Sequence, residues 1–256
     1  MSLSLRISAS SGGLLLGLLL MLLSLHPAGA QVAVRRDSSA FRPQELIAPG
    51  VLMTAGIGIH WLASESIDIP LQDDVQRLRS RWGEVPLYNY TFKYIPALPL
   101  AMDVGLGLLG AKAEHGFLDR CLEAGIATGL VSVSALAIKG LIDSPRPDGR
   151  DNNAFPSGHC CIAFVGAELV RMEYGWGWGA GAYAVATTVA ALRVYHNRHY
   201  MSDLLMGAGM GILAAHAGRW LLEPTKRLLN PGVQVTLAPS VDPYSGTICA
   251  GLAMNF

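Results

Sequence analysis

The sequence predicts an all-α fold, a six-helix bundle followed by a short C-terminal β-hairpin. Three observations lead to this fold class. Long apolar segments recur along the 256 residues, and stretches containing Gly and Pro separate them. Hydrophobic residues make up 51% of the chain, which is enough for one large core. Beyond Pro231 the apolar residues alternate with a period of two, as in strands.

The first 30 residues have the layout of a secretory signal peptide. Arg6 precedes an apolar run over 14–25, and the small-residue triplet A-G-A ends at Ala30. The apolar run is short for a membrane span, which needs about 20 residues. We therefore favour cleavage after Ala30 over a retained anchor, and we expect the polar segment 31–45 to be flexible.

We expect the six helices to form one domain over residues 46–230. Each coincides with an apolar segment and ends near a glycine, a proline or a polar loop. The expected ranges are 46–64, 94–112, 118–142, 159–174, 178–195 and 202–222.

A shorter amphipathic helix is expected over residues 71–82. It is opened by Asp73 and Asp74, and its three arginines form a solvated face.

The C-terminal segment 231–256 predicts a β-hairpin. Val233, Val235 and Leu237 alternate with polar residues, a D-P-Y-S-G turn follows, and apolar residues alternate again up to Phe256. Two strands cannot close a barrel by themselves, since a barrel needs at least about eight.

Membrane crossing is the less favoured interpretation of the helices. Glu123, Lys139 and Glu168 lie within apolar segments, and charges are costly in hydrocarbon. The mean hydropathy of +0.36 is also modest for a wholly embedded bundle. We expect an exported protein, periplasmic or associated with the envelope, for which contact with a membrane surface stays open.

Charge and cysteines exclude several classes. The 19 basic and 19 acidic residues balance, and no basic cluster marks a nucleic-acid partner. The cysteines lack C-x-x-C spacing, so we expect core residues, although an exported protein could pair two of them. They are Cys121, Cys160, Cys161 and Cys249.

The first segment with chemical character runs from Lys139 to Pro147. It places Lys139 at the end of a predicted helix and Arg146 in the loop that follows. Two cations suit a phosphate dianion, because arginine offers a planar fork and lysine a compact charge.

The second segment is Pro156-Ser157-Gly158-His159, immediately before an apolar run. Ser157 is placed to cap a helix, and Gly158 allows the backbone to approach a ligand. Free N–H groups at a helix start bind anions, so this segment predicts a second part of a phosphate site with an imidazole beside it.

The third segment runs from Arg193 to Asp203. His199 and Asp203 are four residues apart, which places them on one face if helical geometry begins near His199. The carboxylate can then hold one ring nitrogen's proton and leave the other nitrogen free to attack phosphorus. His196 lacks this spacing, and we expect it to lie at the rim of the site or behind the residues that contact the phosphate.

Taken together, K-x6-R-P, P-S-G-H and R-x5-H-x3-D resemble the motifs of the type 2 phosphatidic acid phosphatase (PAP2) family. That family shares its fold with vanadium haloperoxidases and bacterial class A non-specific acid phosphatases. The resemblance spans about residues 46–222 and implies the six-helix PAP2/haloperoxidase-like bundle.

The resemblance also implies a role for each residue. His199 becomes a phosphohistidine, Asp203 orients it, and His159 is the general acid and later the base. No metal or other cofactor is implied. The residues expected to bind the phosphate are Lys139, Arg146, Ser157, Gly158 and Arg193.

We therefore expect a metal-independent phosphatase that acts on phosphate monoesters or diphosphates. A phosphorylated lipid is favoured as the substrate, and a small soluble ester stays open. The alternative is a vanadium-dependent haloperoxidase, because vanadate mimics the trigonal-bipyramidal phosphate, although the chain is short for that group.

Overall fold

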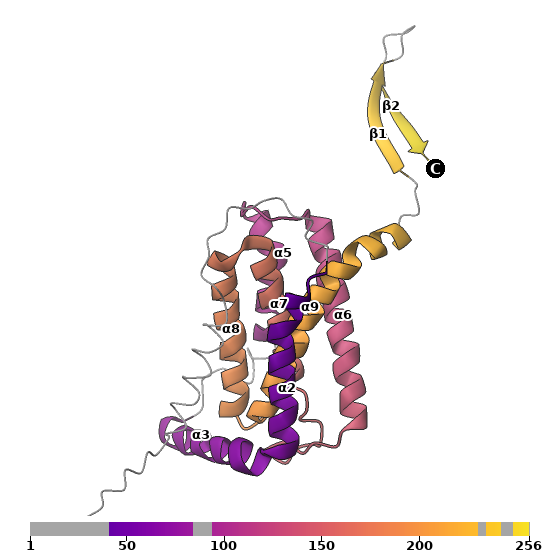
Figure 1. Cartoon of the computed structure of the whole chain (residues 1–256). Helices are drawn as coiled ribbons and strands as arrows, with labels where there is room; N and C mark the ends of the chain where they lie inside the picture. Colours follow the sequence, from indigo (N-terminus) through magenta and orange to yellow (C-terminus); the bar gives the residue numbers. More distant parts are fainter. Residues whose placement is uncertain (1–40, 84–93, 230–233, 242–247, 256) are drawn as a thin grey trace, which may run out of the picture.

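A computed structural model gives the structure of residues 41–83, 94–229, 234–241 and 248–255 (Figure 1). The predicted signal peptide and most of the segment 31–45 lie outside these residues. A 3-10 turn begins at Pro43, inside the segment predicted to be flexible. Most of the described part is helical, which confirms an all-α bundle.

The apolar ranges predicted as helices overlap the helices of the structure. Whether six is the full number stays a prediction, because 1–40 and 84–93 are not described. The bundle helices are α2 (Ile47–Leu62), α5 (Leu98–Leu108), α6 (Phe117–Leu141), α7 (Gly158–Tyr174), α8 (Trp176–Tyr195) and α9 (Met201–Leu229). Short turns accompany them: η1 (Pro43–Leu46), η2 (Ser64–Asp68) and η3 (Ile95–Ala97).

Helix α9 lies at the centre of the bundle, among α2, α6 and α7 (Figure 1). Three of its glycines make this packing close. A Cβ at Gly207 would lie 2.8 Å from the Ser157 carbonyl of the α7 start, and one at Gly218 would lie 2.9 Å from the Glu123 carbonyl of α6. At Gly209 it would lie 2.8 Å from the Pro49 carbonyl of α2. Only glycine allows these backbones to approach so closely.

The end of α9 differs from the prediction. The expected helix ends at residue 222, just before Pro224, yet α9 continues through this proline to Leu229. A proline inside a helix removes one backbone hydrogen bond, and helices commonly bend there without ending.

The amphipathic helix α3 (Ile69–Trp82) lies across one end of the bundle (Figure 1). Its inward face buries Leu71, Gln72 and Val75, whereas Arg77 and Arg81 are exposed. The expected solvated arginine face is therefore present. Helix α3 follows α2 through the π-helical turn η2, which buries Asp68.

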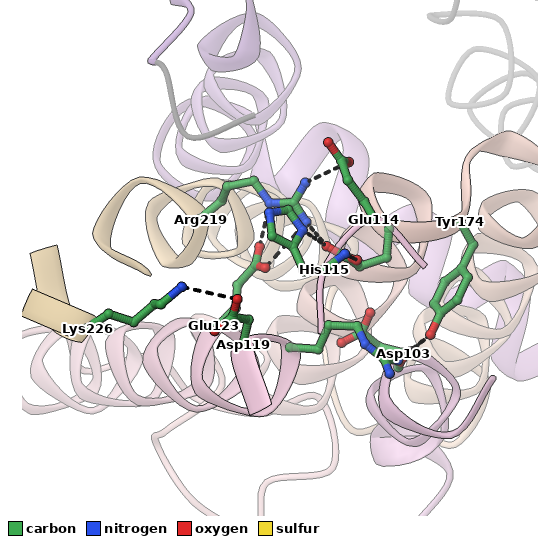
Figure 2. A network of polar contacts seen from close by, with 10 residues as sticks. Asp103, Glu114, His115, Asp119, Glu123, Tyr174, Arg219 and Lys226 are labelled. Atoms are coloured by element: carbon green, nitrogen blue, oxygen red, sulfur yellow. Dashed lines mark hydrogen bonds and ion pairs between the residues drawn. The ribbon is translucent and has the colours of Figure 1, made fainter. Parts of the chain in front are cut away.

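The opposite end of the bundle contains a polar network (Figure 2). Arg219 of α9 donates to Glu123 of α6 at 2.9 Å and also contacts Glu173 of α7. His115 Nδ1 lies 2.7 Å from Glu173. Sixteen residues separate Asp203 from Arg219 along α9, or about 24 Å at the helical rise of 1.5 Å per residue. The network therefore connects α6, α7 and α9 far from the predicted site.

Two helices are long and apolar enough to cross a membrane, by length and composition alone: Pro43–Leu62, which joins η1 to α2, and α6. Core helices of soluble proteins can pass the same test, but they are mostly buried. Here only 17% and 22% of the tested windows are buried. On α6, Val133 and Leu136 are 69% and 68% exposed. The bundle therefore presents an apolar outer surface.

Beyond α9 the backbone forms two antiparallel strands, β1 (Gln234–Val241) and β2 (Ile248–Asn255). Gln234 pairs with Asn255, and Val241 pairs with Ile248. The turn predicted between them lies outside the described residues, so the hairpin as a whole stays a prediction.

Candidate active site

The three predicted segments meet at the end of the bundle where α3 lies. The Ser157 N–H donates to the Asp203 carbonyl at 3.0 Å, which joins the second segment to the third. Arg146 Nη1 lies 3.3 Å from His199 Nε2, which joins the first to the third. Lys139 lies near the end of α6, and Arg146 lies in the loop that follows. Ser157, Gly158 and His159 lie at the start of α7. Arg193 lies near the end of α8, His199 lies just before α9, and Asp203 lies in the first turn of α9.

His199 and Asp203 are in contact. His199 Nδ1 lies 3.2 Å from Asp203 Oδ2, and both residues are at most 1% exposed. The same oxygen accepts the backbone N–H of Tyr200 at 2.9 Å. When the carboxylate accepts Nδ1–H, the lone pair of Nε2 is left facing Arg146.

The protonation of this pair follows from burial and from the nearby cations. Burial, with Arg193 and Arg146 close by, holds the pKa of His199 well below its usual range. Burial raises the pKa of Asp203 to about 6, although the Tyr200 N–H opposes this rise. Above that pH, the site holds a neutral imidazole beside a carboxylate, which is the state that nucleophilic attack by nitrogen requires.

His159 belongs to the same electrostatic cluster. Burial lowers its pKa to about 4, and the charges of Arg193 and Arg146 add to the effect. A bound phosphate dianion would offset these positive charges. The pKa of His159 would then rise, and the ring could carry a proton for a leaving group.

The cations are held by groups beside them. Lys139 Nζ donates to the Asn153 carbonyl at 2.5 Å. Arg146 Nε donates to the Asp151 carboxylate at 2.7 Å, which leaves Nη1 beside His199. Arg146 is thus oriented through Nε, while its Nη1 points to His199 Nε2. This arrangement suits the binding of a phosphate oxygen.

The start of α7 has the character of an anion site. Ser157 precedes the helix, is fully buried, and makes no side-chain cap. Its Oγ has no hydrogen-bond partner among the described residues. A buried hydroxyl normally has one, and a phosphate oxygen would supply it. A Cβ at Gly158 would meet no atom within 4 Å, so the space beside this backbone is open.

The two histidines of the third segment are distinguished by their contacts. The His199 ring faces Asp203, whereas the buried His196 ring packs edge-on against Tyr195, with centroids 5.4 Å apart. The spacing of four residues thus identifies the histidine that contacts the carboxylate.

Sequence reasoning missed the residues that hold the motif side chains. Asp151 orients Arg146, and Asp68 of η2 accepts two hydrogen bonds from Ser202. For Asp151, the weak signal was its acidic side chain in the same loop as Arg146. Nothing in the sequence pointed to Asp68, which is 134 residues away from its partner.

A group that could hold a metal lies at the opposite end of the bundle. His115, Glu123 and Glu173 offer ligand atoms within 4.8 Å of one another. However, Arg219 already contacts both carboxylates (Figure 2). A divalent cation would have to displace this buried guanidinium, so the group fits an ion-pair network better than a metal centre.

Comparison with known proteins finds a family model that matches the part of the chain containing the site. Residues 121–226 match the model of the PAP2 superfamily, and this range includes every predicted site residue. The Lipid A 1-phosphatase of Porphyromonas gingivalis is 42% identical over 125 residues, or 46% of this chain. That match spans 27% of the relative, so the chain covers only about a quarter of the relative's length.

Two solved structures are also similar. Aquifex aeolicus LpxE is 19% identical, with a TM-score of 0.46, and the match covers 59% of this chain and 93% of LpxE. A transmembrane PAP2 type phosphatidylglycerolphosphate phosphatase from Bacillus subtilis is 21% identical, with a TM-score of 0.45. That match covers 71% of this chain and 97% of the Bacillus protein.

Proposed function

We propose that the chain is a phosphatase of the PAP2 type, which acts through a phosphohistidine, because residues 121–226 match the model of the PAP2 superfamily. The observation that carries this proposal is the position of His199. Its Nδ1 faces Asp203 and its Nε2 faces Arg146, so the attacking lone pair lies where a phosphate would be bound.

The proposed reaction has two steps. His199 Nε2 attacks phosphorus, the P–O bond to the leaving group breaks, and His159 gives its proton to the departing oxygen. His159 then takes a proton from water, the water oxygen attacks phosphorus, and the P–N bond breaks to release inorganic phosphate. Asp203 holds Nδ1–H throughout.

The proposed phosphate-binding groups stabilise charge as it develops on the phosphoryl oxygens. Two are held in place by neighbouring residues, one is a buried hydroxyl without a hydrogen-bond partner among the described residues, one is at the open start of α7, and one is a buried arginine in the last turn of α8. They are Lys139, Arg146, Ser157, Gly158 and Arg193. This chemistry needs no metal.

A phosphorylated lipid is the proposed substrate class. The apolar outer surface of α2 and α6 supports it, because a lipid substrate requires an enzyme that contacts a membrane. The relatives also support it: one is named for lipid A and one for phosphatidylglycerol phosphate. The relatives named for an activity are phosphatases, so the haloperoxidase alternative is not proposed.

We also propose that the chain acts outside the cytoplasm, in the periplasm or envelope. The signal-like layout of residues 1–30 supports export. The helical unit over 46–230 is the proposed catalytic domain, with 231–256 as a separate hairpin.

Phosphate release tests the function. The detergent-solubilised protein is offered lipid phosphates, isoprenyl diphosphates and soluble phosphate esters, each with EDTA present. We expect release from the lipid substrates to exceed release from soluble esters. Release that EDTA abolishes would contradict metal-independent chemistry, and release from soluble esters alone would contradict the lipid assignment.

The matched pair His199→Ala and His196→Ala tests the site. Both residues are buried histidines of the same loop, but only His199 contacts Asp203. We expect His199→Ala to abolish phosphate release and His196→Ala to retain most of it. Equal loss in both variants would refute the assignment of the nucleophile.

A further inference from the structure

His199 lies in the short connection between α8 and α9. Two buried polar residues from another part of the chain form hydrogen bonds at the two ends of this connection. Asp68 ends η2 and Gln72 lies in the first turns of α3. They are four residues apart and therefore lie on one helical face. Asp68 is 1% exposed and Gln72 is 5% exposed.

Asp68 holds the connection on the side that follows His199. Its Oδ1 accepts the Ser202 N–H at 3.0 Å, and its Oδ2 accepts the Ser202 hydroxyl at 2.5 Å. Ser202 is the second residue of α9 and directly precedes Asp203. The carboxylate of Asp68 therefore satisfies a free N–H group in the first turn of α9.

The free N–H groups of that first turn need a hydrogen-bond acceptor from elsewhere in the chain. A helix normally has such an acceptor in the side chain of the preceding residue, but here this residue is Tyr200, which cannot provide a short capping oxygen. Asp203 caps the Tyr200 N–H from within the helix, as in a capping box. The other half of the cap comes from Asp68, which also brings a negative charge to a helix N-terminus.

Gln72 holds the connection on the side that precedes His199. Its Nε2 donates to the Val194 carbonyl at 3.0 Å and to Asn197 Oδ1 at 2.6 Å. Asn197 has a φ of +61°, a left-handed conformation that asparagine tolerates better than most residues. Gln72 thus supports the turn at which the chain leaves α8.

We infer that Asp68 and Gln72 are positioning residues, which fix the turn before His199 and the first turn of α9 and so aim Asp203 at the reacting histidine. This inference rests on the proposed function, because it assigns a purpose to the geometry of His199 and Asp203. Both residues act through hydrogen bonds to the connection. The phosphate-binding cations Lys139 and Arg146 come from other elements, whereas Arg193 is the neighbour of Val194, which Gln72 contacts; the test therefore uses Asp68.

Because positioning and phosphate binding belong to different residues, we expect kcat and KM to respond differently to a change at Asp68. In Asp68→Ala, the Asp203 carboxylate loses its support, and a small misplacement of a catalytic group costs about 10- to 100-fold in rate. We expect kcat to fall by about this factor. We expect KM, and the inhibition constant of inorganic phosphate, to stay within about two-fold of wild type, because the hydrogen bonds of Asp68 go to Ser202, whereas Asn153 and Asp151 hold Lys139 and Arg146.

The conservative variant Asp68→Asn distinguishes hydrogen bonding from charge. Asparagine keeps an oxygen for the Ser202 N–H, and the Ser202 hydroxyl can turn to accept from the new amide. We expect kcat within about five-fold of wild type, since a neutral acceptor is weaker than a charged one. If Asp68→Asn is as slow as Asp68→Ala, the hydrogen-bonding role is refuted.

Two more variants complete the experiment. Ser202→Ala removes one of the two hydrogen bonds and keeps the test available if Asp68→Ala does not fold; we expect a smaller fall in kcat with unchanged KM. Asp74→Asn is the control, because this residue of α3 pairs with Arg77 at the surface. Its kcat should equal that of wild type.

The outcomes separate the inference from the proposed function. Unchanged kcat in both Asp68→Ala and Ser202→Ala, or a parallel change in kcat and KM, would overturn the positioning role. If His199→Ala still removes all phosphate release, the proposed function stands in that case. Release that persists in His199→Ala would instead refute the function itself.

Discussion

Replacement of Arg219 by methionine should destabilise the bundle by several kcal/mol. Arg219 donates from Nε to Glu123 at 2.9 Å and also contacts Glu173 (Figure 2). The side chains of both glutamates are at most 1% exposed. Without the guanidinium, Glu123 loses its ion pair with Arg219, and Glu173 keeps its contact with His115. Removal of one partner from a buried ion pair costs about 3–5 kcal/mol, because a charge is left uncompensated.

Thermal unfolding measures this cost. For a domain of this size, 1 kcal/mol shifts Tm by about 2–4 °C, so we expect Arg219→Met to lower Tm by roughly 6–20 °C. Lys226→Met is the matched control, since its pair with Asp119 is more exposed, at 38% and 31%. Exposed pairs contribute about 0–1 kcal/mol.

The comparison between the two variants is decisive. Both remove one cation from α9 and replace it with the same side chain, so a difference reports burial of the partners. If Arg219→Met and Lys226→Met unfold at the same temperature, the network does not stabilise the fold as described. Retained phosphate release in folded Arg219→Met at low temperature would show that the network acts on stability and not on catalysis.

Two further predictions concern the site and the central helix. Because the pKa of Asp203 is about 6, protonation below that pH removes the acceptor for His199 Nδ1–H, and kcat/KM should fall as pH drops through 6; a pH–rate profile that is flat there would contradict this role. Gly209→Ala places a Cβ 2.8 Å from a backbone carbonyl of α2 and should cost about 1–3 kcal/mol in thermal unfolding. Gly58→Ala, with no atom within 4 Å, should be neutral or stabilising by up to about 1 kcal/mol, and equal effects of the two would refute the close-packing argument.

The motif residues could be predicted from the sequence because their chemistry depends on local spacing. Four residues separate His199 from Asp203, and their side chains are in contact. Seven residues separate Lys139 from Arg146, which the structure places at one end of the bundle. These side chains lie close together because a helix end or a short loop fixes the distance between residues that are near in sequence.

The supporting residues could not be predicted in the same way. Asp68 contacts Ser202 across 134 residues, and Gln72 contacts Val194 across 122. Neither belongs to a motif. Their role depends on how α3 crosses the end of the bundle, which hydrophobic periodicity along one helix does not determine.

The charged residues within the apolar segments do not exclude membrane crossing. They would do so only if their side chains faced lipid. In the structure, Glu123 pairs with Arg219, and Glu168 pairs with Arg171 and His216 inside the bundle. Charges within membrane proteins typically face the interior and are paired in this way. These residues are therefore compatible with a bilayer around the bundle.

The central position of α9 has a consequence for assembly. Close contacts at its glycines tie it to α2, α6 and α7, and its first turn provides Asp203. A chain in which the earlier helices have packed but α9 has not docked holds Lys139, Arg146 and His159, without the carboxylate that orients His199. On the proposed function, such a chain has phosphate-binding groups but no aligned nucleophile, so we expect hydrolysis to require the docking of α9.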